Sequence, residues 1–235
     1  MLHRICVLLM LTLASTCGSS ANVKDPRLVP ISAKDLQIAI RQTPLTSAAH
    51  VKFLSRAKSS GLADLAYKEY STLRRSYPNN PNANLWRGMA ALALWRTQKF
   101  VAPVEKDLSQ NPFNIARSSL SKAYQLRPLS PIANMEYGFF LWQYGNQESK
   151  GLELLQKAKR MAFTDPRIHA YLALVYANPS TKSRNLILAR DELLIALKLD
   201  KSYAFAHDLL SSVYRRLGQK QLSELERKKY LSLVP

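Results

Sequence analysis

Apolar side chains recur along this chain at the spacing of amphipathic helices, and small residues recur at a longer, nearly constant interval. Four apolar residues of the segment 204–217 share one face of a predicted helix: Phe205, Leu209, Val213 and Leu217. Four equivalent positions in the second half of the chain follow one another at intervals of 35, 38 and 34 residues: Ala123, Ala158, Ala196 and Tyr230. A period of this length is typical of stacked helical hairpins and indicates binding rather than catalysis.

Five successive helical hairpins are predicted after residue 46. Their approximate ranges are 47–78, 81–128, 131–165, 166–201 and 204–235, and the second carries an insertion at about 96–111. The segment 22–46 is predicted to be a leader with a short helix, because Ser32 and Asp35 have the spacing of a capping box. Leu36 and Ile40 would share one face of that helix, which should continue to Arg41.

The small residues, the glycine turns and the prolines that follow the second helices resemble the tetratricopeptide repeat family, over about 80% of the sequence. The matching residues are Gly61, Ala66, Pro78, Gly88, Ala116, Ala123, Pro128, Gly138, Gly145, Gly151, Ala158, Ala173, Tyr176, Ala189, Ala196, Ser211, Gly218, Ser223 and Pro235. Leu54 and Tyr230 depart from the pattern, since each stands where a small residue is expected. The resemblance implies an α-solenoid of about five hairpins that forms a right-handed superhelix; the alternative is a non-repeat helical bundle.

The N-terminus has the pattern of an export signal. A basic start at Arg4 precedes ten apolar residues, 5–14, a run too short to cross a bilayer, and small residues follow at 19–21. Two exported forms stay open. In the first, residues 1–21 are a signal peptide that is removed. In the second, Cys17 is lipidated; this form is suggested by residues 13–20, which resemble a bacterial lipoprotein signal with Ala14 in place of its leucine. We expect the bacterial periplasm or outer envelope, with or without a lipid anchor; the alternative is an uncleaved N-terminal helix.

The net charge of +18 arises from 34 Lys and Arg against 16 Asp and Glu, which favours acidic partners or anionic surfaces. An envelope polymer or lipid surface ranks above nucleic acid as the anionic partner of an exported protein. The predicted basic surface comprises Arg74, Arg75, Lys157, Lys159, Arg160, Arg215, Arg216, Arg227, Lys228 and Lys229. The alternative is a solvated face stabilised by the helix dipoles.

Catalytic and metal chemistry is not predicted. No two of His50, His169 and His207 have the i, i+4 spacing of a zinc site, and both cysteines, Cys6 and Cys17, lie in the export segment. The sequence contains no phosphate-binding loop, nucleophile elbow or H-E-x-x-H motif. We therefore expect a non-enzymatic protein without cofactors, in which each histidine packs or lies on a helix surface. An enzyme with an unrecognised site ranks third among the functions.

The resemblance implies that the first helices of the hairpins line a concave groove, and here that groove should be apolar. The residues expected to face it are Leu85, Trp86, Met89, Met135, Phe139, Trp142, Tyr171, Leu174 and Leu209. The alternatives are that they pack between helices, or that the insertion or the leader helix fills the groove. The first-ranked function is a scaffold that binds a peptide or protein segment, and the second is a basic module for an anionic envelope polymer or membrane surface. The C-terminal end is predicted to form a homodimer or to dock a partner, because the last segment carries Leu222, Leu225, Leu231 and Leu233.

Overall fold

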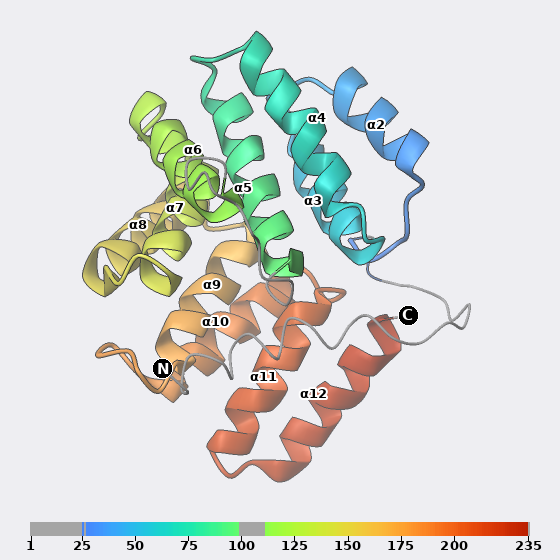
Figure 1. Ribbon diagram of the computed structural model, residues 1–235. Helices are drawn as coiled ribbons and strands as arrows, with labels where there is room; N and C mark the ends of the chain where they lie inside the picture. The colour runs from blue at the N-terminus through green and yellow to red at the C-terminus, as the bar shows by residue number, and fades with distance from the viewer. Residues whose placement is uncertain (1–24, 26, 99–110, 235) are drawn as a thin grey trace. The chain divides into compact units, whose positions relative to one another are not determined.

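The computed structural model of the chain describes residue 25 and residues 27–98 and 111–234. Every regular element in these residues is a helix, which confirms the predicted all-α class. Figure 1 shows the helices, which are α2 (Ala33–Gln42), α3 (Ala49–Ser59), α4 (Ala63–Ser76), α5 (Pro81–Gln98), α6 (Pro112–Leu126), α7 (Pro131–Gln143), α8 (Glu148–Met161), α9 (Pro166–Ala177), α10 (Leu186–Leu199), α11 (Ala204–Arg216) and α12 (Lys220–Leu233). Among these helices, none is both long enough and apolar enough to cross a membrane. The export segment, Cys17 and most of the predicted insertion lie outside the described residues.

The chain divides into two compact units, and the boundary between them falls inside α7. The first unit, Arg27–Phe140, contains α2 to α6 and most of α7. The second unit contains α8 to α12, and Asp25 belongs to it because its carboxylate accepts a hydrogen bond from the amide of Ala204.

Helices pack in pairs within each unit. In the first unit, α3 packs on α4 and α5 on α6; in the second, α9 packs on α10 and α11 on α12. The contacts of α4 with α5, and of α10 with α11, stack one pair on the next. Each pair lies in one of the hairpin ranges inferred from the sequence, and α5 extends to Gln98, which is inside the range predicted as an insertion.

Local sequence explains where the helices begin and turn. Proline is the first residue of α5, α6, α7 and α9, where its missing N–H has no helical partner to lose. The side chains of Asn111, Asp165 and Asn185 accept hydrogen bonds from the first backbone amides of α6, α9 and α10. Gly61 and Gly218 adopt φ of 70° and 79° in the turns of the first and last pairs, a conformation that favours glycine.

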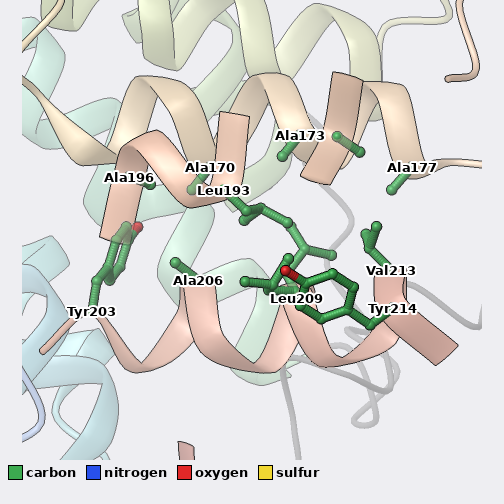
Figure 2. Packing of buried hydrophobic residues seen from close by; sticks show 12 residues of the cluster. Ala170, Ala173, Ala177, Leu193, Ala196, Tyr203, Ala206, Leu209, Val213 and Tyr214 are labelled. Atoms are coloured by element: carbon green, nitrogen blue, oxygen red, sulfur yellow. The ribbon is translucent and has the colours of Figure 1, made fainter. Parts of the chain in front are cut away.

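Small side chains allow the paired helices to approach closely. In the second unit the cluster between α9, α10 and α11 consists half of alanine (Figure 2). It comprises Ala170, Ala173, Ala177, Ala189, Leu193, Ala196, Tyr203, Ala206, Leu209, Leu210, Val213 and Tyr214. In the first unit, Gly88 of α5 lies against α6, and a Cβ at this position would stand 2.8 Å from Cγ of Leu120. Since such a distance is a steric clash, glycine is required for this approach.

Each of five connections between helices is hydrogen-bonded to one polar side chain of the helix that follows it. The carbonyl two residues past the end of the preceding helix bonds to a side chain six residues further on. In α5 and α7 the donor is asparagine: Nδ2 of Asn84 donates to the Pro78 carbonyl at 3.0 Å, and Nδ2 of Asn134 donates to the Pro128 carbonyl at 2.8 Å. These carbonyls follow helix ends and lack a helical partner, so the side chain satisfies a group that burial would otherwise leave unpaired.

Histidine takes the same position in α3, α9 and α11. Nε2 of His50, His169 and His207 lies 3.1, 2.7 and 3.0 Å from the carbonyls of residues 44, 163 and 201. All three rings are buried, so of the two expected placements, packing and the helix surface, the structure shows packing. Unlike asparagine, each ring also reaches the second helix of its own pair: Nδ1 contacts Tyr70, Glu192 and Glu226 respectively.

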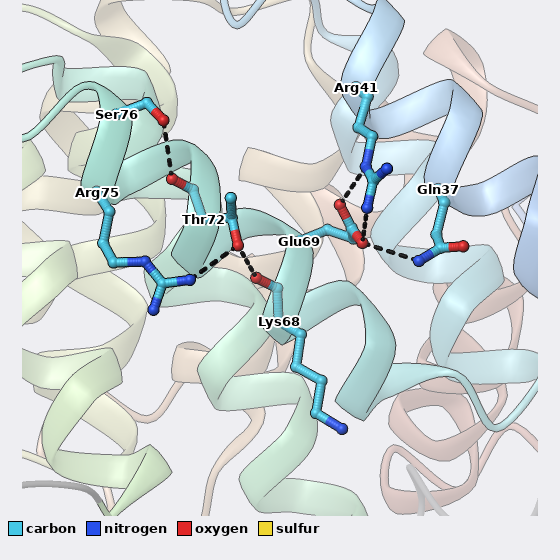
Figure 3. Close-up of polar contacts among 7 residues, drawn as sticks. All are labelled: Gln37, Arg41, Lys68, Glu69, Thr72, Arg75 and Ser76. Atoms are coloured by element: carbon cyan, nitrogen blue, oxygen red, sulfur yellow. Dashed lines mark hydrogen bonds and ion pairs between the residues drawn. The ribbon is translucent and has the colours of Figure 1, made fainter.

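The leader is docked on the first pair. Leu36 and Ile40 of α2 are fully buried, and α2 contacts both α3 and α4. Figure 3 shows Glu69 of α4 accepting hydrogen bonds from Arg41 at 2.7 Å and Gln37 at 2.9 Å. Arg56 of α3 donates to the carbonyls of residues 29 and 30, which precede α2. The leader helix therefore covers the end of this pair, with part of its contact on the second helix, α4.

The fastening of connections gives the first prediction. His207→Ala should lower the free energy of unfolding by roughly 1–3 kcal/mol, because the carbonyl of Lys201 and the carboxylate of Glu226 both lose a buried partner. His207→Asn should lose less, since asparagine makes the carbonyl bond at the equivalent positions 84 and 134. Urea denaturation of the three proteins measures the difference. Equal losses in both variants would show that the carbonyl bond adds no measurable stability.

Candidate functional site

The structure places most of the predicted groove residues in the core. Six have side chains that are less than 9% exposed: Leu85, Trp86, Met135, Phe139, Trp142 and Leu209. The indole of Trp86 donates to the carbonyl of Leu45 at 2.8 Å, and that of Trp142 donates to Oγ1 of Thr181 at 3.2 Å. The expectation that these six side chains face a groove is therefore corrected, because core packing and internal hydrogen bonds occupy them. Whether any of the nine residues contacts a partner stays a prediction.

Three of the nine remain partly exposed: Met89 of α5, and Tyr171 and Leu174 of α9. Met89 and Leu174 are equivalent positions, since each lies five residues after the side chain that fastens the connection, Asn84 or His169. The first helices of two pairs thus present an apolar side chain at the same register, one in each unit.

A strongly perturbed lysine lies on the first helix of the first pair. Burial, and then the charge of Arg96, lowers the pKa of Lys58 to about 8. Lys58 lies on α3 and Arg96 on α5, two first helices that contact each other. Two neighbouring cations favour an acidic group on a ligand that binds there.

The predicted basic residues lie at the ends of α4 and α11 and along α8 and α12. Arg75, Arg160, Arg215, Arg216, Arg227, Lys228 and Lys229 are exposed, whereas Arg74, Lys157 and Lys159 are partly buried. Several hold the fold together: Arg227 pairs with Asp208 at 2.7 Å, Lys229 pairs with Glu226 at 2.7 Å, and Arg216 donates to the carbonyl of Ala177. The basic surface is therefore a mixture of solvated and internally paired charges.

A cavity of about 400 Å³ lies in a notch formed by α8, α9 and α10. The residues that line it are Gln156, Lys159, Arg160, Phe163, Leu172, Tyr176 and Glu192. The carboxylate of Glu192 bridges two cationic groups, with Nζ of Lys159 at 2.6 Å and Nδ1 of His169 at 2.6 Å. Burial acts to raise the pKa of Glu192, but the bonds from His169 and Lys159 outweigh it and lower that pKa.

The ring of His169 is fully used by the fold. Nδ1 lies 2.6 Å from the Glu192 carboxylate and Nε2 lies 2.7 Å from a backbone carbonyl, so both ring nitrogens have partners within the fold. His50 differs, because Nδ1 meets the hydroxyl of Tyr70, which can donate to a neutral ring, and burial lowers the pKa of His50. With both nitrogens bonded internally, these histidines are structural groups and are not placed to act as a base on a substrate.

A second notch, of about 280 Å³, lies between α4 and α5. Its lining residues are Tyr67, Lys68, Ser71, Thr72, Arg74, Arg75 and Arg87, a set without any carboxylate. Arg87 reaches across α5 and donates to the hydroxyls of Ser71 at 3.4 Å and Ser119 at 3.2 Å. Arg75 donates to Thr72, as Figure 3 shows.

Sequence reasoning identified Arg74, Arg75, Lys159 and Arg160 but missed the side chains they meet. Glu192 lies 23 residues after His169, and Glu226 lies 19 residues after His207, so no local motif links them. One signal in the sequence could have indicated these contacts. Positions 50, 84, 134, 169 and 207 are equivalent in the repeat, apart from the insertion in the second hairpin, and each is Asn or His. In the described part of the chain, no group of three His, Cys, Asp or Glu side chains could hold a metal ion.

The paired helices, the small residues between them and the stacking of each pair on the next define a helical-repeat fold of the tetratricopeptide type. The sequence matches no family model and no curated protein. Solved structures do share the fold. MamA 41–end from Desulfovibrio magneticus RS-1 is 18% identical, with a TM-score of 0.51 over 86% of this chain and 97% of that chain.

Two further structures extend the likeness. TTC0263, described as a thermophilic TPR protein in Thermus thermophilus, is 17% identical, with a TM-score of 0.55 over 78% of this chain and 89% of that chain. The APC/C hetero-tetramer Cut9–Hcn1 has a chain that is 15% identical, with a TM-score of 0.65 over 86% of this chain and 35% of that chain. At these identities the likeness concerns the fold, and it confirms the predicted tetratricopeptide solenoid class.

The buried glutamates predict acid sensitivity. Because the fold lowers the pKa of Glu192 and Glu226, their stabilising effect is present above the unfolded pKa of Glu, roughly 4.3, and is lost as the pH falls through the lower folded values. The free energy of unfolding should therefore fall on acidification, and the fall should be shallower in the Glu192→Gln, Glu226→Gln variant. Denaturant titrations across this pH range measure it. Glu153→Gln, at an exposed ion pair with Lys150, should follow the wild type; a wild-type slope in the double variant would contradict the assignment.

Proposed function

We propose that this protein is a non-enzymatic scaffold that binds a segment of a partner protein on the first helices of its hairpins. The observation that carries the proposal is that a first helix in each unit keeps partly exposed apolar residues, Met89 on α5 in one unit and Tyr171 and Leu174 on α9 in the other. Methionine, leucine and tyrosine offer apolar contact area to a bound segment. The neighbouring cations Lys58 and Arg96 favour a segment that also carries an acidic group.

We place this function in the bacterial envelope. The support is the sequence of residues 1–21, which has the pattern of an export signal, and Cys17, which offers a lipidation site. A periplasmic or lipid-anchored protein with this fold would meet its partner outside the cytoplasm.

A second candidate function is binding to an anionic envelope polymer or a membrane surface. It is favoured by the net charge of +18 and by exposed cations such as Arg75, Arg160 and Lys228. Such binding would be weakened strongly by salt, whereas an apolar contact would not.

Capture from a bacterial envelope extract, at low and high salt, tests the two functions. The tagged full chain should retain a discrete protein at high salt, and the Met89→Ser, Tyr171→Ser variant should lose it while keeping its helicity by circular dichroism. Leu129→Ser, at a connection residue that is 73% exposed, is the matched control and should retain it.

Equal retention by the double variant would overturn binding through these residues. Retention at low salt alone, without a discrete protein, would favour the anionic surface.

We also propose that α12 mediates self-association. Leu222 and Leu225, which are 43% and 48% exposed, share a face of this helix. Leu233 was expected to contribute as well, but it is buried. Light scattering at micromolar concentration should report a dimer, and Leu225→Lys should shift it to a monomer. A monomeric wild type would exclude this interface.

A further inference from the structure

The notch between α4 and α5 differs from its equivalents at a position defined by the repeat. This position lies three residues after the first of the two small residues that the repeat pattern places in each second helix, Ala66, Ala116, Gly151, Ala189 or Ser223. The five residues that occupy it are Glu69, Ser119, Leu154, Glu192 and Glu226. Three of the five hairpins therefore carry a carboxylate here, and the hairpin of α5 and α6 carries a hydroxyl.

Where the carboxylate is present, it neutralises a nearby cation. Glu69 pairs with Arg41 at 2.7 Å, Glu192 with Lys159 at 2.6 Å, and Glu226 with Lys229 at 2.7 Å. The two notches correspond closely, because Arg74 and Arg75 stand at the same distance from the end of α4 as Lys159 and Arg160 do from the end of α8. In the α8–α10 notch, the fold itself supplies the anion that these cations require.

At Ser119 no carboxylate takes this place among the residues that the structure describes, and a further cation, Arg87, lies beside it. Arg87 lies three residues after Asn84, a register that holds Leu172 in α9 and Leu210 in α11. Its guanidinium donates to the neutral hydroxyls of Ser71 and Ser119. Exchanging a carboxylate for serine and a leucine for arginine changes the notch by two positive charges relative to the α8–α10 notch.

The remaining groups of the notch are also donors. Nε of Arg74 is buried and, among the described residues, has no hydrogen-bond partner. Arg75 donates to Oγ1 of Thr72 at 3.0 Å, which orients its guanidinium along α4 (Figure 3). Of the four lining cations, Lys68 pairs with Asp64 at 2.7 Å, which leaves three guanidinium groups without a carboxylate lining the notch. A buried donor without a partner is costly unless a ligand satisfies it.

We propose that the α4–α5 notch is a binding site for a phosphate monoester, held by Arg74, Arg75 and Arg87 with the hydroxyl of Ser71, while Ser119 behind the notch holds Arg87. A phosphate monoester carries a charge of about −1.5 to −2 and three terminal oxygens, which suits several guanidinium and hydroxyl donors better than the two oxygens of a carboxylate. The volume of about 280 Å³ leaves room for part of the molecule that bears the phosphate. Binding here is independent of a protein segment on the first helices, so either function can fail while the other holds.

Isothermal titration calorimetry of the full chain tests the site with inorganic phosphate, O-phospho-L-serine and glycerol 3-phosphate as probes, and with acetate at matched ionic strength. The phosphate probes should bind and acetate should not. Tighter binding of phosphoserine would identify a phosphorylated side chain as the source, and tighter binding of glycerol phosphate a lipid or polymer head group. Absence of binding by all three probes, or equal binding of acetate, would overturn the proposal.

Two variants test the site by introducing residues that other hairpins carry at the equivalent positions. Ser119→Glu introduces the carboxylate that other hairpins carry, and Arg87→Leu introduces the leucine of α9 and α11. Each should weaken phosphate binding by about tenfold or more, since a charge-assisted hydrogen bond contributes roughly 1.5–3 kcal/mol. Lys228→Gln, at an exposed lysine of α12, makes the same change in net charge and should bind as the wild type does.

Thermal unfolding separates loss of the site from loss of the fold. Ser119→Glu should be at least as stable as the wild type, because its carboxylate would take the place of the ligand. If Ser119→Glu does not fold, Arg87→Leu alone decides the question. Wild-type affinity in whichever of these two variants folds would show that phosphate binds elsewhere.

Discussion

The stacking of this protein depends on how each connection is held to the helix that follows it. A carbonyl two residues beyond a helix end would be left without a partner, and the side chain at position 50, 84, 134, 169 or 207 bonds to it. Because the acceptor belongs to the connection and the donor to the next helix, the bond fixes the turn between successive pairs. The small residues determine how closely the paired helices approach each other.

The choice between asparagine and histidine at this position determines what the second helix must carry. The amide nitrogen of Asn134 donates only to carbonyls of the connection, whereas histidine has a second nitrogen that reaches a partner on the second helix. In the last two pairs that partner is a glutamate, which also neutralises a lysine. The pair that begins with Asn84 has no such requirement, so Ser119 can replace the carboxylate without leaving a buried histidine unpaired. The notch beside this pair therefore lacks the carboxylate that pairs with a cation in the α8–α10 notch.

The fold could be inferred from the sequence because its determinants are local or periodic. Buried alanines, Gly88 and the turn glycines stand where the repeat spacing places them, and the capping box at Ser32 begins α2. The groove was predicted less well, because helical spacing identifies an apolar face without showing how far the neighbouring helix covers it. Trp86 and Trp142 illustrate this: their indoles bond to Leu45 and Thr181, partners about 40 residues away. The ion pair of the α8–α10 notch, Lys159 with Glu192, also joins residues far apart in the sequence, so it could be identified only from the structure.

Gly88 has a consequence beyond the packing of α5 on α6. It is adjacent to Arg87, as Leu120 is to Ser119, so the contact that a Cβ would destroy lies beside the guanidinium–hydroxyl bond of 3.2 Å. Serine is too short to meet Arg87 across helices held further apart. Steric fit in the core and electrostatic fit in the notch are therefore inherited together, and substitutions at residues 88 and 119 should show strong epistasis. A homologue that replaces this glycine would be free to lose the arginine as well.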